Sequence, residues 1–240
     1  MDTEKKDESL ITSSIQRKGF EGKVFVIIVA GGSGSRMNNV VPKQFLLLNG
    51  RPVLMRTIEK FYNTIPDIHI IVVLAVENNK QWADLCHQYN FTIIHELASG
   101  GETRFYSVKN GLDKVPIGSL VGIHDAARPL VSAQTIRSAF ECAAEKGNAV
   151  PAVSIHDSIR EVDEEGNKMM NREKLRIIQT PQCFQSTLIK DAFSQNYSHR
   201  YTDDASVAEE WGMKINLVEG NSRNIKITTP QDMIIATALL

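Results

Sequence analysis

The fold is organised around one segment, residues 24–37, which reads Val24-Phe25-Val26-Ile27-Ile28-Val29-Ala30-Gly31-Gly32-Ser33-Gly34-Ser35-Arg36-Met37. Its first six residues are bulky and apolar, which predicts a strand buried on both faces. The glycines that follow let the backbone turn tightly and approach a ligand closely. Successive N–H groups in such a turn form an anion-binding concavity. Arg36 and the nearby Lys43, in Pro42-Lys43-Gln44, add two positive charges, so the segment predicts a phosphate-binding loop after the first strand.

A glycine-rich turn can also serve only to reverse the chain, and for the loop alone this alternative stays open. The loop does not match the dinucleotide pattern Gly-x-Gly-x-x-Gly, because Met37 stands where the third glycine would fall. It also lacks the Gly-Lys-Ser/Thr ending of a P-loop. The paired cations favour a nucleotide-phosphate loop of another kind.

Composition limits what the rest of the chain can be. At 240 residues, with 42% hydrophobic and 23% charged residues, the chain suits one large α/β domain or two small ones with a sizeable core. The formal net charge of −1, without a basic block, argues against nucleic acid as a partner. Three widely spaced cysteines, at 86, 142 and 183, suit neither a disulfide framework nor a zinc site and indicate reduced thiols.

Residues 1–22 are polar and carry both signs of charge, so they resemble neither a signal peptide nor a transit peptide. We expect a flexible N-terminal extension at 1–22, followed by a single domain at 23–240. No apolar run approaches the roughly 18 residues of a membrane span, so no membrane contact is expected. These features predict a cytoplasmic protein.

Apolar runs alternate with helical patterns along the chain. Strands are expected at 24–29, 68–74, 91–94, 120–123, 148–153, 213–218 and 224–228. Helices are expected at 52–62, 80–89, 132–146, 186–195 and 203–211, with one ending at 112 and a last one starting at Pro230. The alternation predicts βαβ units, a mostly parallel central sheet and a ligand beyond the carboxyl ends of its strands.

Residues 154–178 have a different pattern and predict a projecting β-arm. Segment 158–162 alternates polar and apolar residues, a polar turn follows at 163–166, and 175–178 is apolar again. We expect these two segments to pair as a hairpin. A two-stranded ribbon is marginally stable by itself, so the arm should pack on another element or another subunit.

Two further segments are expected at the same edge of the sheet as the glycine loop. Gly100 and Gly101 form a second glycine turn, which is either a binding turn or an ordinary strand-to-helix connection. Asp125 ends a buried strand, where a carboxylate can meet a metal-bound phosphate or a ribose hydroxyl. Its alternative role is an ion pair with Arg128 that shapes the turn. His124 points the other way along the strand and is expected either to pack or to support the site's residues from behind, rather than to catalyse.

Seven motifs occur in the order found in one enzyme family. They are Ala30-Gly31-Gly32-x-Gly34-x-Arg36-Met37, Pro42-Lys43-Gln44, Gly100-Gly101-x-x-Arg104-x-x-Ser107, His124-Asp125-Ala126-Ala127-Arg128-Pro129, Thr180-Pro181-Gln182, Thr202-Asp203-x-Ala205-Ser206, and Val218-Glu219-Gly220 with Asn224-Ile225-Lys226. On these motifs, residues 24–240 resemble the cytidylyltransferases that act on 2-C-methyl-D-erythritol 4-phosphate in the non-mevalonate isoprenoid pathway.

The resemblance implies a Rossmann-like, glycosyltransferase-A-type α/β fold and a homodimer joined through the arm. It also implies Mg²⁺-dependent transfer of CMP from CTP to the sugar-alcohol phosphate, with release of pyrophosphate. Arg36 and Lys43 would stabilise charge at the transferring phosphorus. CTP would be held by Ala30, Gly31, Gly32, Gly34, Gly101, Glu102, Ser107 and Asp125. Asp125 would also contact the metal, which the CTP phosphates would mostly hold.

The acceptor side follows from the same resemblance. The acceptor would be bound by the catalytic Lys226, by Thr180 and Thr202 and, from the neighbouring subunit's arm, by Ser158 and the catalytic Arg172. Two arm positions depart from the family pattern, with Ser158 in place of threonine and Asn171 in place of aspartate before Arg172. The hydroxyl and the guanidinium are kept at these sites.

The chemistry does not call for more residues than these. The attacking phosphate monoester has a second pKa of about 6, so it is largely a dianion at neutral pH and requires no general base. Two alternatives remain open on the sequence. One is a related cytidylyltransferase that uses ribitol 5-phosphate, and the other is a non-catalytic nucleotide-binding module that keeps the fold.

Overall fold

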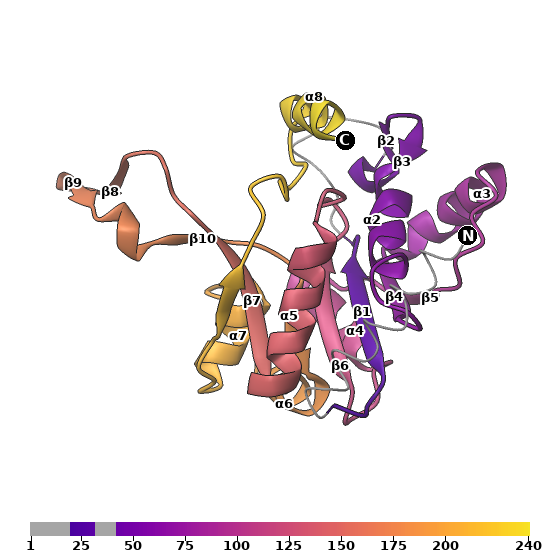
Figure 1. Cartoon of the computed structure of the whole chain (residues 1–240), viewed down its shortest axis with the longest axis horizontal. Coiled ribbons are helices and arrows are strands. Elements are labelled where there is room, and N and C mark those ends of the chain that lie inside the picture. Colours follow the sequence, from indigo (N-terminus) through magenta and orange to yellow (C-terminus); the bar gives the residue numbers. More distant parts are fainter. Residues whose placement is uncertain (1–19, 32–41) are drawn as a thin grey trace, which may run out of the picture.

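The structure, a computed structural model, describes residues 20–31 and 42–240 (Figure 1). Residues 1–19 of the predicted extension, and the segment 32–41 with Gly32, Gly34 and Arg36, lie outside the described residues. The division into an extension and one domain therefore stays a prediction. In the described part of the chain, no helix is long and apolar enough to cross a membrane.

The central sheet has eight strands within the described residues, in the order β10–β7–β11–β6–β1–β4–β5, with β12 paired to β7. They are β1 (Val24–Val29), β4 (His69–Leu74), β5 (Glu96–Ser99), β6 (Leu120–Asp125), β7 (Asn148–Ser154), β10 (Arg176–Ile178), β11 (Gln182–Gln185) and β12 (Leu217–Glu219). β1 pairs in parallel with β4 and β6, and β4 pairs in parallel with β5. The predicted α/β fold with a mostly parallel core is confirmed.

Helices cover both faces of the sheet. Alternate residues of β1 point to opposite faces and pack under different helices. Val26 and Ile28 belong to the core under α2 (Val53–Tyr62), α3 (Asn79–Gln88) and α5 (Ala133–Lys146). Phe25 and Ile27 belong to a second core under α4 (Arg104–Leu112), α6 (Ser186–Ala192) and α7 (Asp204–Glu210). The result is a three-layer arrangement, with α5 lying across the sheet in Figure 1.

A smaller unit lies above the carboxyl ends of the strands. The turn at Asn49-Gly50 joins β2 (Leu47–Leu48) to β3 (Arg51–Pro52). The last helix, α8 (Pro230–Leu239), packs beside this hairpin through a third apolar cluster that includes Leu48 and Ala236. Figure 1 shows α8 at the top, away from the arm.

Of the predicted strands, those at 91–94 and 224–228 do not form, and the one at 213–218 is shorter than expected. Phe91 packs its ring against Trp82, with ring centroids 5.8 Å apart, and the edge strand is formed instead by β5, where Leu97 pairs with Val72 of β4. The strand expected at 213–218 is limited to β12, and no strand forms at 224–228. The backbone of Ile227 instead donates a hydrogen bond to Ala127 O at 2.9 Å, which attaches this segment to the turn after β6.

β11 was missed by the sequence reasoning. It lies between β6 and β7 and is antiparallel to both. Its two apolar residues, Cys183 and Phe184, are buried in opposite cores. Such a short segment, with glutamine at both ends, carries neither an apolar run nor an alternating pattern.

The projecting arm is present, but its pairing differs from the prediction (Figure 1). β8 (Ile159–Asp163) pairs with β9 (Gly166–Met170), so the hairpin closes directly across the polar turn. The segment expected as the second strand is β10, and it pairs with β7 of the central sheet. In this pairing Ile177 lies opposite another apolar residue, Val153.

Candidate functional site

Three turns begin at one level at the carboxyl edge of the parallel strands. Backbone bonds set this level: Ala30 N donates to Val73 O at 2.9 Å, Ala126 N to Val29 O at 3.1 Å, and Gly100 N to Leu74 O at 2.6 Å. The two glycine turns, at Gly31 and at Gly100, also approach each other closely. A Cβ atom on Gly31 would lie 3.2 Å from the hydroxyl oxygen of Ser107, so a larger residue here would crowd the second turn.

A cavity of about 370 Å³ opens at this edge. Every described residue that the sequence assigned to CTP lines it: Ala30, Gly31, Gly101, Glu102, Ser107 and Asp125. Lys43 and Lys226 line it as well. The structure therefore brings together the two glycine turns, the carboxylates of Glu102 and Asp125, and three cations, since Arg104 also lines the cavity.

The second glycine turn is fixed by its own hydrogen bonds. Gly101 N donates to Ser107 Oγ at 3.0 Å, and this hydroxyl in turn donates to Thr103 O at 3.0 Å. Thr103 also caps α4. A Cβ atom on Gly101 would lie 2.4 Å from Cβ of Tyr106, so the turn requires glycine. Ser107 therefore shapes the turn that faces the cavity.

The Lys43 turn is attached to the first loop by its neighbour Gln44. The buried side chain of Gln44 donates to Ala30 O at 3.0 Å. This bond fixes the short helical turn Lys43–Phe45 at the end of β1 and places Lys43 at the cavity.

An adjoining cavity of about 280 Å³ shares three residues with the first, namely Arg104, Asp125 and Lys226. Thr180 and Thr202, which the sequence assigned to the acceptor, line this second cavity. We call Arg104, Asp125 and Lys226 the shared wall. A ligand in either cavity would contact it.

The carboxylate of Asp125 lies among three positively charged side chains. Its Oδ2 lies 2.9 Å from Lys226 Nζ and 3.3 Å from Arg128 Nε, and its Oδ1 lies 3.6 Å from Arg104 Nε. Burial raises the pKa of the Asp125 carboxyl, but Arg104, Lys226 and Arg128 outweigh burial and hold it well below its usual range. The ion pair with Arg128 thus exists, and Asp125 faces both cavities as well.

Arg104 is held from behind by a second carboxylate. Its Nη1 and Nη2 donate to Asp204 Oδ1 and Oδ2 at 2.8 and 2.6 Å, and Asp204 is fully buried. Burial lowers the pKa of Arg104, but Asp204 and Asp125 raise it above its ordinary value, so the guanidinium keeps its charge. The sequence motifs contained Arg104 without assigning it a role, and no signal linked it to a partner 100 residues away.

The described residues hold no group of three or more histidine, cysteine, aspartate or glutamate side chains that could bind a metal ion. Asp125 offers a carboxylate but already faces three cations. Mg²⁺ commonly binds one or two carboxylates together with substrate phosphates. The donor set therefore fits a cation held mostly by a bound triphosphate, and does not fit a site made by protein groups alone.

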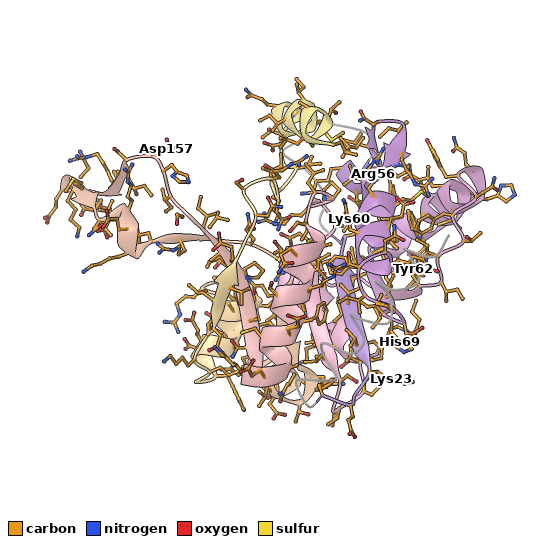
Figure 2. The ribbon with its side chains drawn as sticks, in the orientation of Figure 1. Lys23, Arg56, Lys60, Tyr62, His69 and Asp157 are labelled. Atoms are coloured by element: carbon orange, nitrogen blue, oxygen red, sulfur yellow. The ribbon has the colours of Figure 1, made fainter. Side chains whose placement is uncertain are left out.

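The two arm residues do not join this site in the same chain. Ser158 is exposed beside Asp157, which Figure 2 labels on the arm, well away from the body of the protein. Arg172 lies in the short helical turn Arg172–Lys174 and contacts His156 O. Neither residue lines the two cavities.

Comparison with known proteins identifies the family. A model of the 2-C-methyl-D-erythritol 4-phosphate cytidylyltransferase family matches residues 24–240. A protein of that name from Phocaeicola vulgatus is 47% identical over 215 residues, which cover 90% of this chain and 98% of the relative. Another, from Azobacteroides pseudotrichonymphae, is 48% identical over 217 residues, with the same shares covered.

Solved structures agree. The crystal structure of the cytidylyltransferase from Francisella tularensis matches with a TM-score of 0.77 and 31% identity, covering 91% of this chain and 100% of that one. The one from Thermus thermophilus matches with a TM-score of 0.74 and 30% identity, covering 90% and 98%. The chain belongs to the family of 2-C-methyl-D-erythritol 4-phosphate cytidylyltransferases, which are nucleotidyltransferases.

Proposed function

We propose that this protein transfers CMP from CTP to 2-C-methyl-D-erythritol 4-phosphate. An oxygen of the acceptor phosphate attacks the α-phosphorus of CTP and forms the new P–O bond. The bond from the α-phosphorus to the bridging oxygen breaks, and its electron pair leaves with pyrophosphate. The observation that carries this proposal is the pair of adjoining cavities with a shared wall, because the reaction needs two anionic substrates to meet at one point.

The shared wall carries positive charge, which can offset the repulsion between the two substrates. Two phosphate groups repel each other, and catalysis of phosphoryl-type transfer consists mostly of positioning and charge stabilisation. We call the cavity of about 370 Å³ the nucleotide cavity and the cavity of about 280 Å³ the acceptor cavity. Lys226 lines both cavities, and Lys43 lines the nucleotide cavity. We assign these two cations to the charge that develops at the α-phosphorus, with Arg36 of the glycine loop as a third by resemblance. Gly101, Glu102 and Ser107 hold the nucleoside, with Thr180 and Thr202 beside the acceptor.

We also propose a divalent cation, Mg²⁺, bound with CTP. Asp125 and the phosphates of CTP would hold it, and it would neutralise charge on the phosphate oxygens. Asp125 is suited to this because its low pKa keeps it ionised. Lys226 and Arg104 keep the carboxylate at the wall before any ligand binds.

We propose further that the arm serves the site of a second copy of this chain. The support is that Ser158 and Arg172 lie on a projecting arm, outside both cavities, and that large apolar side chains on it are exposed. Val162 is 76% exposed and Met169 77%. Exposed apolar side chains on a two-stranded ribbon are suited to burial in a dimer. Arg172 and Ser158 would then bind the acceptor across the interface.

Mixing two inactive variants tests the arm directly. Arg172→Ala subunits lack the arm cation, and Lys43→Ala subunits lack a cation of the nucleotide cavity. If each arm serves the partner's site, a mixed dimer contains one site with both cations, so mixing restores part of the activity. An arm that acts within its own chain would leave every site defective and the mixture inactive. Sedimentation of each variant checks that both still form dimers.

The reaction itself is tested by pyrophosphate release from CTP and Mg²⁺, with and without 2-C-methyl-D-erythritol 4-phosphate. We expect release that depends on the acceptor and a product with the mass of the cytidine diphosphate adduct. Binding of CTP without pyrophosphate release would instead support a non-catalytic nucleotide-binding module.

A further inference from the structure

The shared wall is assembled from segments far apart in the sequence, and buried polar residues connect these segments behind it. Four of them form a closed ring of hydrogen bonds, made by His124, Arg128, Asn224 and Thr180. His124 Nε2 lies 3.1 Å from Arg128 O, and Arg128 Nη1 donates to Asn224 O at 2.7 Å. Asn224 Nδ2 donates to Thr180 O at 2.8 Å, and Thr180 Oγ1 lies 3.0 Å from His124 Nδ1.

The surrounding contacts fix the direction of each bond. Thr180 Oγ1 accepts the backbone N–H of Asp125 at 3.1 Å, so its own proton is available for His124 Nδ1. Arg128 O is a carbonyl oxygen and can only accept, so the imidazole proton lies on Nε2 and is donated to it. Asn224 Nδ2 also faces Gln179 Oε1 at 3.3 Å, so two acceptors set the orientation of the amide.

The ring connects the residues on either side of the shared wall. His124 and Arg128 flank Asp125, and Asn224 precedes Lys226 by two residues. Thr180 holds the backbone of Asp125 and lines the acceptor cavity. His124 and Asn224 are fully buried, and neither lines either cavity. Any effect that these two side chains have on a substrate must therefore pass through other residues.

We propose that His124 and Asn224 are positioning residues, which through this ring set the place of the Asp125 carboxylate relative to the Lys226 ammonium and the acceptor. The inference rests on the proposed function. The ring is on the acceptor side of the wall, whereas the turn at Gly101 is fixed by its own bonds to Ser107. Arg128 and Thr180 of the ring line the acceptor's cavity but not that of CTP, whereas Asp125 lines both. Opening the ring should therefore affect the acceptor more than CTP.

The test uses two substitutions that fill space but open the ring at different points, His124→Phe and Asn224→Leu. For each, we expect kcat/KM for the acceptor to fall by on the order of 100-fold, as a misplacement of about 1 Å can cause. We expect a smaller rise in KM for CTP, because Asp125 lines the cavity of CTP as well. Equal changes in both KM values, or a loss confined to thermal stability, would overturn the proposal.

A double variant separates one ring from two unrelated structural residues. A ring that is already open loses little more when it is opened again, so the double variant should resemble the worse single variant. Two independent sites would add their effects. Strict additivity would contradict the ring.

Two controls keep the test decisive. Asn148 is a buried asparagine whose amide donates to Lys214 O at 3.0 Å, away from the wall, so Asn148→Leu should lower stability without separating the two KM values. His124→Asn places a carbonyl oxygen near the position of Nδ1 and should recover part of the acceptor kcat/KM lost in His124→Phe. Failure of Asn to recover any would count against the bond to Thr180.

A measurement that does not depend on catalytic activity can test the hydrogen-bonded ring separately from the proposed reaction. Nitrogen NMR of the His124 ring should show a proton on Nε2 and none on Nδ1, as the contacts with Arg128 O and Thr180 Oγ1 require. A proton on Nδ1 would overturn the ring even in an active enzyme. An inactive wild-type protein with the Nε2–H form would overturn the proposed reaction and leave the ring in place.

Discussion

Replacement of Asp204 by asparagine probes the buried support of the shared wall. Asp204 accepts two hydrogen bonds from Arg104, at 2.8 and 2.6 Å, and is fully buried. Asparagine has nearly the same shape but loses the charge and one of the two acceptor oxygens. The partly buried Arg104 guanidinium would then keep its positive charge but lose one of the two acceptor oxygens that bind it.

The magnitude follows from the geometry. Removing one partner of a buried ion pair costs about 3–5 kcal/mol. Asparagine keeps one acceptor, and Arg104 keeps Asp125 at 3.6 Å and has a side chain that is 29% exposed, so the lower end applies, about 3 kcal/mol. A protein of this size loses about 2–4 °C in Tm for each kcal/mol, which gives a decrease of about 6–12 °C.

Thermal unfolding followed by circular dichroism measures this shift. The matched control is Asp84→Asn on α3, because Asp84 is exposed and the same charge is removed. We expect the control to melt close to the wild type. If Asp204→Asn melted with the control, the Arg104–Asp204 pair would not support the wall, and our explanation of Arg104 would be wrong.

Three further predictions address the nucleotide cavity and the buried imidazole. Gly101→Ala should raise KM for CTP, because its Cβ would lie 2.4 Å from Cβ of Tyr106; steady-state kinetics at saturating acceptor would contradict this if KM for CTP were unchanged. Lys43→Ala should lower kcat by about 100- to 1000-fold with an unchanged circular dichroism spectrum, and near-normal turnover would refute its role. The pKa of His124 falls from 6.5 to about 4 on folding, so the unfolded chain binds more protons in this window, and the free energy of unfolding should fall by about 3 kcal/mol between pH 7 and 4. Denaturant titrations at both pH values measure this fall, which His124→Phe should reduce.

The parallel half of the sheet was predictable because its strands are unbroken apolar runs. Residues 24–29 and 120–125 are buried on both faces, and sequence patterns report such burial directly. β11 was not predictable, because Gln182 and Gln185 are held by tertiary contacts rather than by an apolar pattern. Gln182, for example, donates to Asp203 Oδ2 at 2.8 Å. The pairing within the arm was predicted wrongly for a related reason. The apolar segment that contains Ile177 pairs with Val153 of β7 in the central sheet, and the local sequence pattern does not reveal this partner.

The candidate site was predictable where it consists of turns that follow strands. The carboxyl ends of parallel strands meet at one edge, so Gly31, Gly101 and Asp125 were expected together, and they line one cavity. Side-chain partners across the fold left no comparable signal. Neither the Arg104–Asp204 pair nor the contact of Asn224 with Thr180 follows from spacing, because each joins segments whose proximity only the folded chain creates.

The central claim is the choice of acceptor, and the most direct measurement is pyrophosphate release from CTP and Mg²⁺ with each acceptor supplied separately. We predict release with 2-C-methyl-D-erythritol 4-phosphate and a much lower kcat/KM with ribitol 5-phosphate. Lys226→Ala should reduce release with the preferred acceptor, because Lys226 lines both cavities. Activity with ribitol 5-phosphate alone would contradict the proposed substrate.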